Sequence, residues 1–250
     1  MTAKIREIET VSALVRSRIP GVGFVINPYL GCGHGCRYCY AEFMRRHSRY
    51  NRASRWGDFV EVKKNIVGVL AAELARKRKS GSVFLSSVCD PYQPAEKDYR
   101  LTRGCLELLR NYGWEISILT RSPLVLRDTD ILSTALDCRV GFSVPTDDER
   151  IRKRLEPSAP PIPARIEALK RLRETGIRTW AFIAPMLPMD PERLYRLLNP
   201  VVEEVMIDPL NYVSRVEGFY RRQGWGYALG REYASQTRRT LRKLFGGKSR

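Results

Sequence analysis

Short apolar runs alternate with amphipathic stretches along most of the chain, and this alternation predicts its elements. Six apolar runs have the length of buried strands and lie at Gly23–Asn27, Ser82–Ser87, Glu115–Thr120, Arg139–Val144, Arg178–Ala184 and Val202–Asp208. Between them, apolar residues recur at helical spacing, which predicts helices at Asn65–Lys79, Leu101–Asn111, Leu124–Leu136, Asp147–Leu155, Pro163–Glu174 and Pro191–Leu198. Gly113 and Gly176 each follow a predicted helix, as glycines that end helices do.

Strands that alternate with helices favour an α/β fold with a parallel sheet. In a chain of 250 residues, closure into a partial (β/α)6 barrel of the TIM type is the expected solution. We expect a single domain over residues 1–250, with a core at about 22–210 and a basic C-terminal extension at 211–250. Within the extension, Arg231–Phe245 is predicted to be a basic helix, and the prolines from Pro157 to Pro163 predict a stiff, extended connector.

Positive charge is concentrated in two stretches. Lys and Arg number 44 against 27 Asp and Glu, which gives a formal charge of +17. Residues 41–79 hold eleven basic and four acidic residues, and residues 215–250 hold ten and two. Such stretches attract polyanions, so DNA or RNA is an expected partner, although a solvated basic surface explains the same composition.

The chain carries no sign of a membrane or secreted protein. It has no charge-free apolar run of about 18 residues, and its start, MTAKIREIET, lacks an apolar signal stretch. We therefore expect a cytoplasmic protein with no membrane partner and with reduced thiols. Six cysteines in a chain of this length indicate metal or redox chemistry rather than a disulfide scaffold.

Three of the six cysteines lie close together after the first predicted strand. Cys32, Cys36 and Cys39 form a C-x3-C-x2-C pattern on a glycine-rich segment. Glycines let the backbone bend and approach a bound group closely, and thiolates are the usual ligands of iron–sulfur clusters. Two alternatives remain open. Zinc could use the three thiols with His34, and a redox pair could form from Cys36 and Cys39, although that pair leaves Cys32 unexplained.

The pattern, with the aromatic Tyr38 before the last cysteine, resembles the signature of the radical S-adenosylmethionine (SAM) family. The resemblance implies that Cys32, Cys36 and Cys39 hold a [4Fe-4S] cluster whose open iron chelates SAM. In that family one electron from the cluster splits SAM to methionine and a 5′-deoxyadenosyl radical. The radical then removes a hydrogen atom from the substrate.

A closer resemblance covers about two thirds of the chain, from Asn27 to Pro188. The segments NPYLGCGHGCRYCYAE, VCDPYQPAEKDYRLTR, ILTRSPLVLRD and RLEPSAPP are similar to the radical SAM group related to spore photoproduct lyase, the DNA photolyase-like proteins. Members of this group differ in their reactions, so the resemblance does not by itself imply photoproduct repair.

The resemblance also places cofactor-binding residues at strand ends, where active sites of parallel barrels gather. It implies that Ser87, Arg121 and Ser143 hold the polar groups of SAM and that Tyr38 flanks the adenine. Arg121 stands where a lysine is more usual, and its planar guanidinium suits a carboxylate. Cys89 lies near the position of the lyase's hydrogen-donating cysteine, shifted by about two residues, so a donor and a small residue beside SAM both remain open.

Other polar or reactive residues have simpler interpretations. Cys105 and Cys138 are expected to be buried small side chains. Asp90, Glu96 and Lys97 are expected to anchor the loop DPYQPAEK, which two prolines stiffen. The pairs Arg127-Asp128 and Glu156-Pro157 are interpreted as local salt-bridge and turn features.

The leading hypothesis is therefore a radical SAM enzyme, lyase-like, with a substrate that is expected to be nucleic acid. It would need an electron donor such as flavodoxin or ferredoxin. No second group of cysteines has cluster spacing, so no auxiliary cluster is expected. A second hypothesis is radical SAM modification of a peptide or small molecule. A third, of another class, is a zinc-stabilised nucleic-acid-binding protein without catalysis, and an electron carrier is a fourth.

Overall fold

A computed structural model of the chain describes residues 3–249. Within these residues the main sheet has seven strands in the order β10-β9-β8-β7-β6-β3-β2. Their bounds are β2 Val15–Arg16, β3 Phe24–Ile26, β6 Ser82–Leu85, β7 Glu115–Thr120, β8 Asp137–Ser143, β9 Arg178–Ile183 and β10 Glu204–Ile207. Every neighbouring pair from β3 to β10 is parallel, and only the short β2 is antiparallel. The predicted parallel α/β sheet is confirmed, and each predicted strand lies within two residues of its observed bounds.

The helices follow the strands, as expected for β/α units. The α-helices are α1 Ile66–Ala75, α2 Glu96–Tyr99, α3 Leu101–Asn111, α4 Thr129–Leu132, α5 Glu149–Leu155, α6 Ile162–Glu174, α7 Pro191–Leu198, α8 Glu217–Arg222 and α9 Arg231–Phe245. The 3-10 helices are η1 Tyr40–His47, η2 Pro123–Asp128, η3 Val213–Arg215, η4 Gly226–Leu229 and η5 Gly246–Lys248. The basic helix predicted at Arg231–Phe245 is confirmed at those bounds, and the last residue of the predicted 211–250 extension lies outside the described residues.

Three helix predictions need correction. The predicted helix Leu124–Leu136 is two short pieces, η2 and α4, because the buried Asp128 leaves helical geometry where Arg103 and Arg127 bind its carboxylate. Helix α1 ends at Ala75 rather than at Lys79, since the next four residues are all basic and repel one another. Helix α6 begins at Ile162, one residue before the predicted start, and Pro163 lies in its first turn, where its missing N–H costs nothing. The connector predicted to be extended contains a turn at Pro157 and Ser158.

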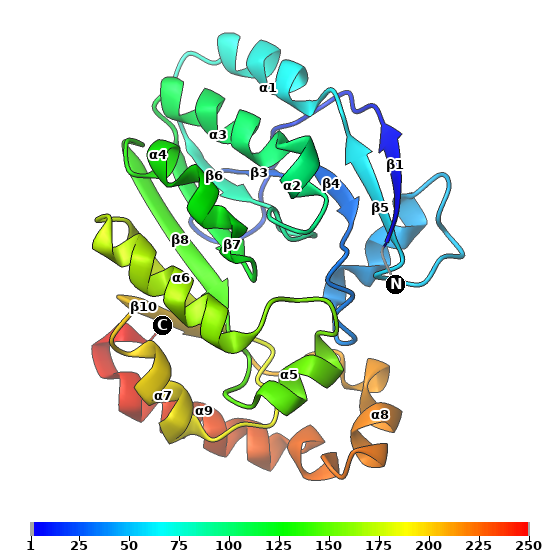
Figure 1. The fold of residues 1–250 in the computed structure, drawn as a ribbon, viewed down its shortest axis with the longest axis vertical. Coiled ribbons are helices and arrows are strands. Elements are labelled where there is room, and N and C mark those ends of the chain that lie inside the picture. Colours follow the sequence, from blue (N-terminus) through cyan, green and yellow to red (C-terminus); the bar gives the residue numbers. More distant parts are fainter. Residues whose placement is uncertain (1–2, 250) are drawn as a thin grey trace.

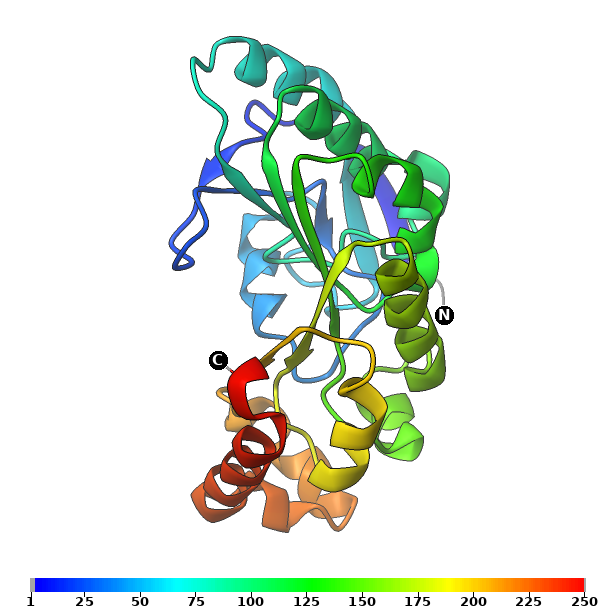
Figure 2. The same ribbon diagram turned by 90° about the vertical axis from the view of Figure 1, so that its left-hand side faces the viewer.

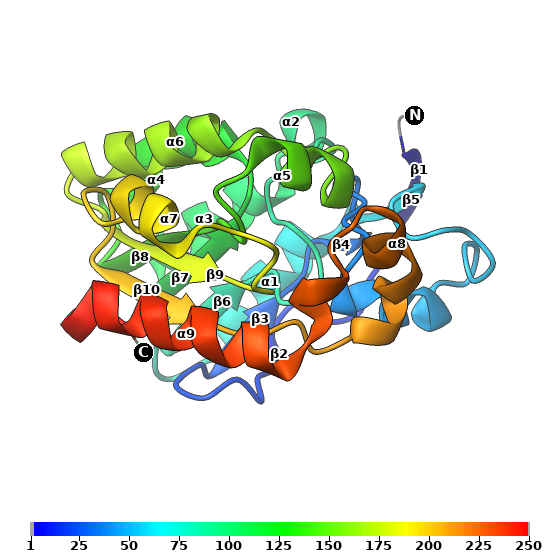
Figure 3. The same cartoon turned by 90° about the horizontal axis from the view of Figure 1, so that it is seen from below.

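The main sheet has two different faces. Apolar residues of one face, such as Ile118, Val140 and Ile183, form the main core with α1, α3, α6 and α7, which lie together on that side (Figure 1). The opposite face carries Ser117, Arg139, Gly141 and Trp180, and an added Cβ at Gly141 would lie 2.2 Å from the Trp180 ring. Viewed from below, no long helix of α1–α7 covers this inner face (Figure 3). The inner face of the partial barrel is therefore the side available to ligands.

A small second sheet was not predicted. Its order is β1-β5-β4, with β1 Lys4–Ile8, β4 Tyr29–Gly31 and β5 Phe59–Lys63. Strand β1 is exposed and charged, and β4 has three residues, so neither has the apolar pattern of a strand. The sheet lies against η1 at one end of the molecule (Figure 1). It positions the segment that carries the three cysteines.

The C-terminal helix α9 lies along the free edge of the main sheet, beside β10 (Figures 2 and 3). Leu241 and Phe245 are buried, and the Phe245 ring packs edge-on against Tyr195 of α7 with centroids 5.1 Å apart. Lys248 Nζ donates hydrogen bonds to the Asn199 and Val202 carbonyl oxygens at 2.8 and 3.1 Å. The extension is thus packed onto the sheet. No helix of residues 3–249 combines the length and the apolar character needed to cross a bilayer.

Candidate active site

The three cysteines lie on a segment that leaves β4 and enters η1, here called the cysteine loop (residues 31–40). Cys32 and Cys36 are buried, and Cys39 is partly exposed. Gly31 has φ +90°, and a Cβ there would lie 2.5 Å from the carbonyl oxygen of Phe59. A Cβ at Gly57 would lie 2.6 Å from Cα of Gly35. The loop is therefore packed against neighbouring backbone where only glycine fits.

The surroundings of the thiols suit a metal cluster. Burial raises the pKa of all three, to about 12 for Cys36, and neighbouring thiols add to the rise at Cys32 and Cys36. Opposing this, the backbone N–H of His34 points to Cys32, and the N–H of Ala41 and the Trp56 indole point to Cys39. These donors stabilise thiolates once positive metal charge offsets the cost of burial. The soft donor set of the loop therefore fits an iron–sulfur cluster.

The same geometry does not favour one zinc ion. The ring of His34 faces other oxygens, with Nε2 3.3 Å from Asp90 Oδ2 and Nδ1 3.3 Å from the Ser158 carbonyl oxygen. Among residues 3–249, no three His, Cys, Asp or Glu side chains converge as ligands of one ion. A cluster has no such requirement, because each thiolate binds a different iron.

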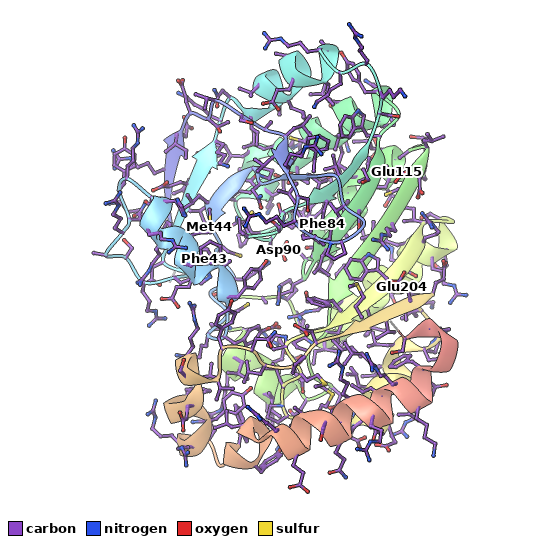
Figure 4. The ribbon with its side chains drawn as sticks, turned by 180° about the vertical axis from the view of Figure 1, so that it is seen from behind. Phe43, Met44, Phe84, Asp90, Glu115 and Glu204 are labelled. Atoms are coloured by element: carbon purple, nitrogen blue, oxygen red, sulfur yellow. The ribbon has the colours of Figure 1, made fainter. Side chains whose placement is uncertain are left out.

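The loop after β6 holds the cysteine loop by several contacts. Gln93 is fully buried, accepts a hydrogen bond from the Gly33 N–H at 2.8 Å and donates one to the Gly31 carbonyl at 3.2 Å. The Tyr29 hydroxyl donates to the buried Glu96 carboxylate. Asp90 also accepts hydrogen bonds from Thr120 Oγ1 at 2.6 Å and from the Arg121 N–H at 2.8 Å. Figure 4 shows Asp90 between η1, which carries Phe43 and Met44, and the strand that carries Phe84.

The anchoring role predicted for this loop is thus observed for Asp90 and Glu96. Glu96 accepts from the Thr102 N–H at 2.9 Å and from Arg127 Nη2 at 2.7 Å. No such contact is seen within residues 3–249 for Lys97, which is exposed. Arg127 also pairs with Asp128 at 2.8 Å, as the local interpretation of that pair expects.

Glu156 begins a turn, as predicted, because the Ala159 N–H donates to its carbonyl oxygen at 3.2 Å. Its side chain is also the centre of a buried network that the local interpretation missed. It is fully buried and accepts hydrogen bonds from the Tyr38 hydroxyl, from Arg121 Nε at 2.8 Å and from Arg165 Nη2 at 2.5 Å. Arg165 is also fully buried and donates to the Ser143 carbonyl at 2.8 Å. The network joins the cysteine loop to the ends of β7 and β8. Residues far apart in sequence meet here, which local pattern does not reveal.

The residues predicted to bind the cofactor lie around the Glu156 network, at the end of the partial barrel that we call its mouth. Tyr38 is buried in an apolar cluster with Ile151 and Leu155, and its hydroxyl lies within the Glu156 network. Ser143 ends β8, and Ser87 follows β6, where its carbonyl accepts a hydrogen bond from the Tyr40 hydroxyl. Arg121 is already engaged by Glu156 and by Tyr38 Oη at 3.3 Å. Their roles toward SAM stay predictions.

Cys89 packs beside the cysteine loop, against the cluster of buried residues that contains Cys32 and Phe59. Burial raises its pKa to about 11, which keeps the thiol protonated at neutral pH. The preceding turn is strained, because Ser86 has φ +65° without being glycine. Cys105 and Cys138 are buried in the main core, as expected.

Lys63 is a site residue that the sequence analysis missed. In β5, alternate side chains share a face, so Lys63 lies on the side of Phe59, which packs against Cys32 and Cys89. Burial lowers the pKa of its ammonium group, and the interaction with Cys89 opposes this shift. Lys63 forms no ion pair within residues 3–249. The only sign of this in the sequence is that Lys63 follows Phe59 by four residues, a spacing that places both side chains on one face of a strand.

Comparisons with known proteins agree with this geometry. The family model described as the radical SAM superfamily matches residues 26–199. An uncharacterized protein of Methanocaldococcus jannaschii is 39% identical over 190 residues, which cover 75% of this chain and 70% of that protein. An uncharacterized Mycobacterium tuberculosis protein is 31% identical over 185 residues, and the match spans 71% of this chain and 54% of that protein.

Two solved structures share the fold. Spore photoproduct lyase, bound to AdoMet and a dinucleoside spore photoproduct, superposes with a TM-score of 0.65 at 14% identity, covering 98% of this chain and 80% of the lyase. Streptococcus suis SuiB, bound to its precursor peptide SuiA, gives a TM-score of 0.57 at 17% identity, covering 88% of this chain and 44% of SuiB. At these identities the likeness shows the fold alone, whereas the family match spans most of the chain. The chain therefore belongs to the radical SAM superfamily.

Proposed function

We propose that this radical SAM enzyme holds a [4Fe-4S] cluster on Cys32, Cys36 and Cys39 and binds SAM beside it. The observation that carries the proposal is three thiols on one loop at the mouth of a parallel partial barrel, with N–H groups nearby that point to two of them. When bound, the cluster and SAM supply a one-electron reduction and the abstraction of a hydrogen atom from the substrate. An external donor such as flavodoxin or ferredoxin would supply the electron.

Two cations at the mouth differ in their availability to the SAM carboxylate. Arg121 already shares its charge with the buried Glu156, whereas Lys63 has no acidic partner among residues 3–249. A largely buried ammonium group is costly without an anion. Lys63 therefore joins Arg121, Ser87 and Ser143 as a residue that orients SAM. In this proposal Tyr38 keeps its place beside the adenine, held by Glu156.

Cys89 is proposed as the hydrogen donor to a product radical. A donor must hold its hydrogen, and the raised pKa of about 11 keeps the thiol protonated at neutral pH. Its contact with the residues around Cys32 places it beside the cysteine loop.

A nucleic acid is the proposed substrate class. The formal charge of +17 and its concentration in residues 215–250 support it. Peptide modification is the second candidate, favoured by the shared fold with SuiB, whose structure holds a precursor peptide. The non-catalytic zinc protein loses its basis with the family assignment and with the orientation of His34.

The first test is the variant Cys36→Ala, with Cys138→Ala as control. We expect Cys36→Ala to lose most of the iron and sulfide that the anaerobically reconstituted protein retains, together with reductant-dependent formation of 5′-deoxyadenosine. Cys138 begins β8 at the opposite end of the sheet, so its variant should retain both. Iron content, absorbance near 400 nm and product are measured by chemical assay, spectroscopy and chromatography. Wild-type SAM cleavage by Cys36→Ala would overturn the cluster assignment.

A further inference from the structure

A groove of about 840 Å³ separates α9 from the segments that follow β9 and β10. Met186 and Asn211 line it from those segments, and Arg231, Arg238, Arg239 and Arg242 line it from α9. These segments lie at the carboxyl ends of parallel strands, the end of a barrel that carries active sites. We call this surface the α9 groove. It lies outside the residues proposed above for SAM.

The arginines of the α9 groove have no counter-charges within residues 3–249. Arg231, Arg238 and Arg242, with Ser235 between the first two, recur at spacings of four, three and four, so they form one stripe along α9, and Arg239 lies beside it. The opposite face of the helix, with Thr237, Leu241 and Phe245, is buried. No acidic side chain of the described chain pairs with any of the four arginines. The buried Nε of Arg238 has no acceptor there, and its Nη2 reaches only the Ile207 carbonyl at 3.4 Å. A buried donor without an acceptor suits an external anion, and here it adds to the charge of the stripe.

Exposed tyrosines continue from this groove toward the cysteine loop. Tyr227, 62% exposed, stacks edge-on against the groove residue Tyr233, with centroids 5.6 Å apart. Tyr212, 48% exposed, adjoins the groove residues Asn211 and Val213. Tyr212 lies close enough to Tyr40 to contribute to the raised pKa of that hydroxyl.

A direct contact also connects the α9 groove to the cysteine loop. Arg215 follows the groove segment at the end of η3, and its Nη1 donates to the Cys39 carbonyl at 2.8 Å. Its guanidinium also lies over the Tyr212 ring, 5.2 Å from the centroid. The segment that walls the groove is therefore the one that contacts the cysteine loop.

We infer that the α9 groove binds the phosphodiester backbone of a single nucleic-acid strand and directs an unstacked base past Tyr212 to the cysteine loop. Guanidinium groups bind phosphate through paired hydrogen bonds, and exposed aromatic rings stack on bases of any sequence. A peptide would need acidic side chains at regular intervals to match the arginine stripe, whereas every nucleotide carries a phosphate. This inference rests on the nucleic-acid substrate class of the proposed function.

The test compares two charge-matched double variants of the reconstituted protein. Arg239→Glu/Arg242→Glu changes the groove, and Arg78→Glu/Lys79→Glu makes the same change of charge in the other basic stretch, at exposed residues without ion pairs in the described chain. Binding of a fluorescent single-stranded oligonucleotide is followed by anisotropy over a range of salt concentrations. We expect the groove variant to bind roughly tenfold or more weakly, with a salt slope smaller by about one for each phosphate that it no longer binds. The control variant should bind within about twofold of the unaltered protein.

Tyr212→Leu separates stacking from charge. We expect it to weaken binding of the single strand by roughly fivefold or more while leaving the salt slope unchanged. Circular dichroism checks that each variant is folded. Equal losses in the two double variants, unchanged binding by the groove variant, or preference for polyglutamate over the oligonucleotide would each overturn the inference.

The inference and the proposed function fail separately. SAM cleavage by the unaltered protein is measured in the same preparations. If that protein cleaves SAM but does not bind the oligonucleotide at low salt, the groove inference is overturned and the enzyme assignment stands. If it binds the oligonucleotide through the groove but holds no cluster, the enzyme assignment fails and the groove inference stands.

Discussion

Two adjacent lysines have opposite surroundings at the residue scale. Lys63 ends β5 on the face of Phe59, beside Cys89, and has no acidic partner among residues 3–249. Lys64 lies outside the strand, half exposed, with its Nζ 3.9 Å from Glu7 and 4.0 Å from Glu9. Exposed pairs of this kind contribute little, whereas a desolvated cation pairs strongly with an anion that reaches it.

This difference predicts that Lys63→Met weakens SAM binding and that Lys64→Met does not. We expect the dissociation constant of SAM to rise about 10- to 100-fold for Lys63→Met, the effect of losing one charge-assisted hydrogen bond. For Lys64→Met it should stay within about twofold. Isothermal titration calorimetry of the anaerobically reconstituted proteins measures both. Equal affinities in the two variants would show that Lys63 does not contact SAM.

At the scale of elements, two connecting segments, the second of which runs into α2, make the candidate site. The cysteine loop leaves β4, and the loop after β6 holds it through Gln93, Asp90 and Glu96. Gln93 bonds both a donor and an acceptor of the cysteine-loop backbone, and its side chain and the Gly31 carbonyl are shielded from water. Loops positioned in this way combine the exposure that a ligand needs with the rigidity of the strands below them.

Gln93→Ala should therefore loosen the cysteine loop. It leaves the Gly33 N–H and the Gly31 carbonyl without partners, so we expect the free energy of unfolding to fall by about 2–4 kcal/mol. The retention of iron after dialysis should fall as well. Lys97→Ala, in the same loop and exposed, should change the free energy by less than about 0.5 kcal/mol. Urea unfolding and iron assays compare the two variants. Equal stabilities would contradict the role of Gln93 in holding the cysteine loop.

The whole molecule depends on buried charges that join distant segments. Glu156 links the cysteine loop to β7 and α6 through Tyr38, Arg121 and Arg165. Burial alone would raise the pKa of Glu156, but the two guanidinium groups outweigh it and lower the pKa to about 2. A carboxyl group whose pKa is lower in the folded than in the unfolded state stabilises the fold at pH values above its unfolded pKa.

The free energy of unfolding should consequently fall as the pH drops from about 4.5 to about 2. Glu156→Gln should be less stable at pH 7 by about 3–5 kcal/mol, because two buried arginines lose their counter-charge, and should depend less on pH in that window. Asp58→Asn, at an exposed pair 3.9 Å apart, is the control. Urea unfolding of chelator-treated protein, followed by circular dichroism, measures all three. A wild-type stability that is constant down to pH 3 would refute the role of Glu156.

Local pattern was sufficient for much of the fold. Strand β7 and helices α3, α7 and α9 have the predicted bounds, because the spacing of their apolar residues is a property of the local sequence. Strand β1 escaped prediction because its side chains are charged and exposed, and only its pairing with β5 makes it a strand. Helix α4 is short because of ion pairs with residues outside it.

The sequence by itself determined the parallel α/β fold. It also determined the triplet Cys32, Cys36 and Cys39, because three ligands within eight residues stay close together in any local conformation. Only the tertiary structure decided what surrounds the triplet. It brought Glu156 to Tyr38, placed Lys63 beside Cys89 and, within residues 3–249, left the arginines of α9 that line the groove without counter-charges. These contacts join residues tens of positions apart, and their energies come from burial and charge pairing that exist only once the chain has folded.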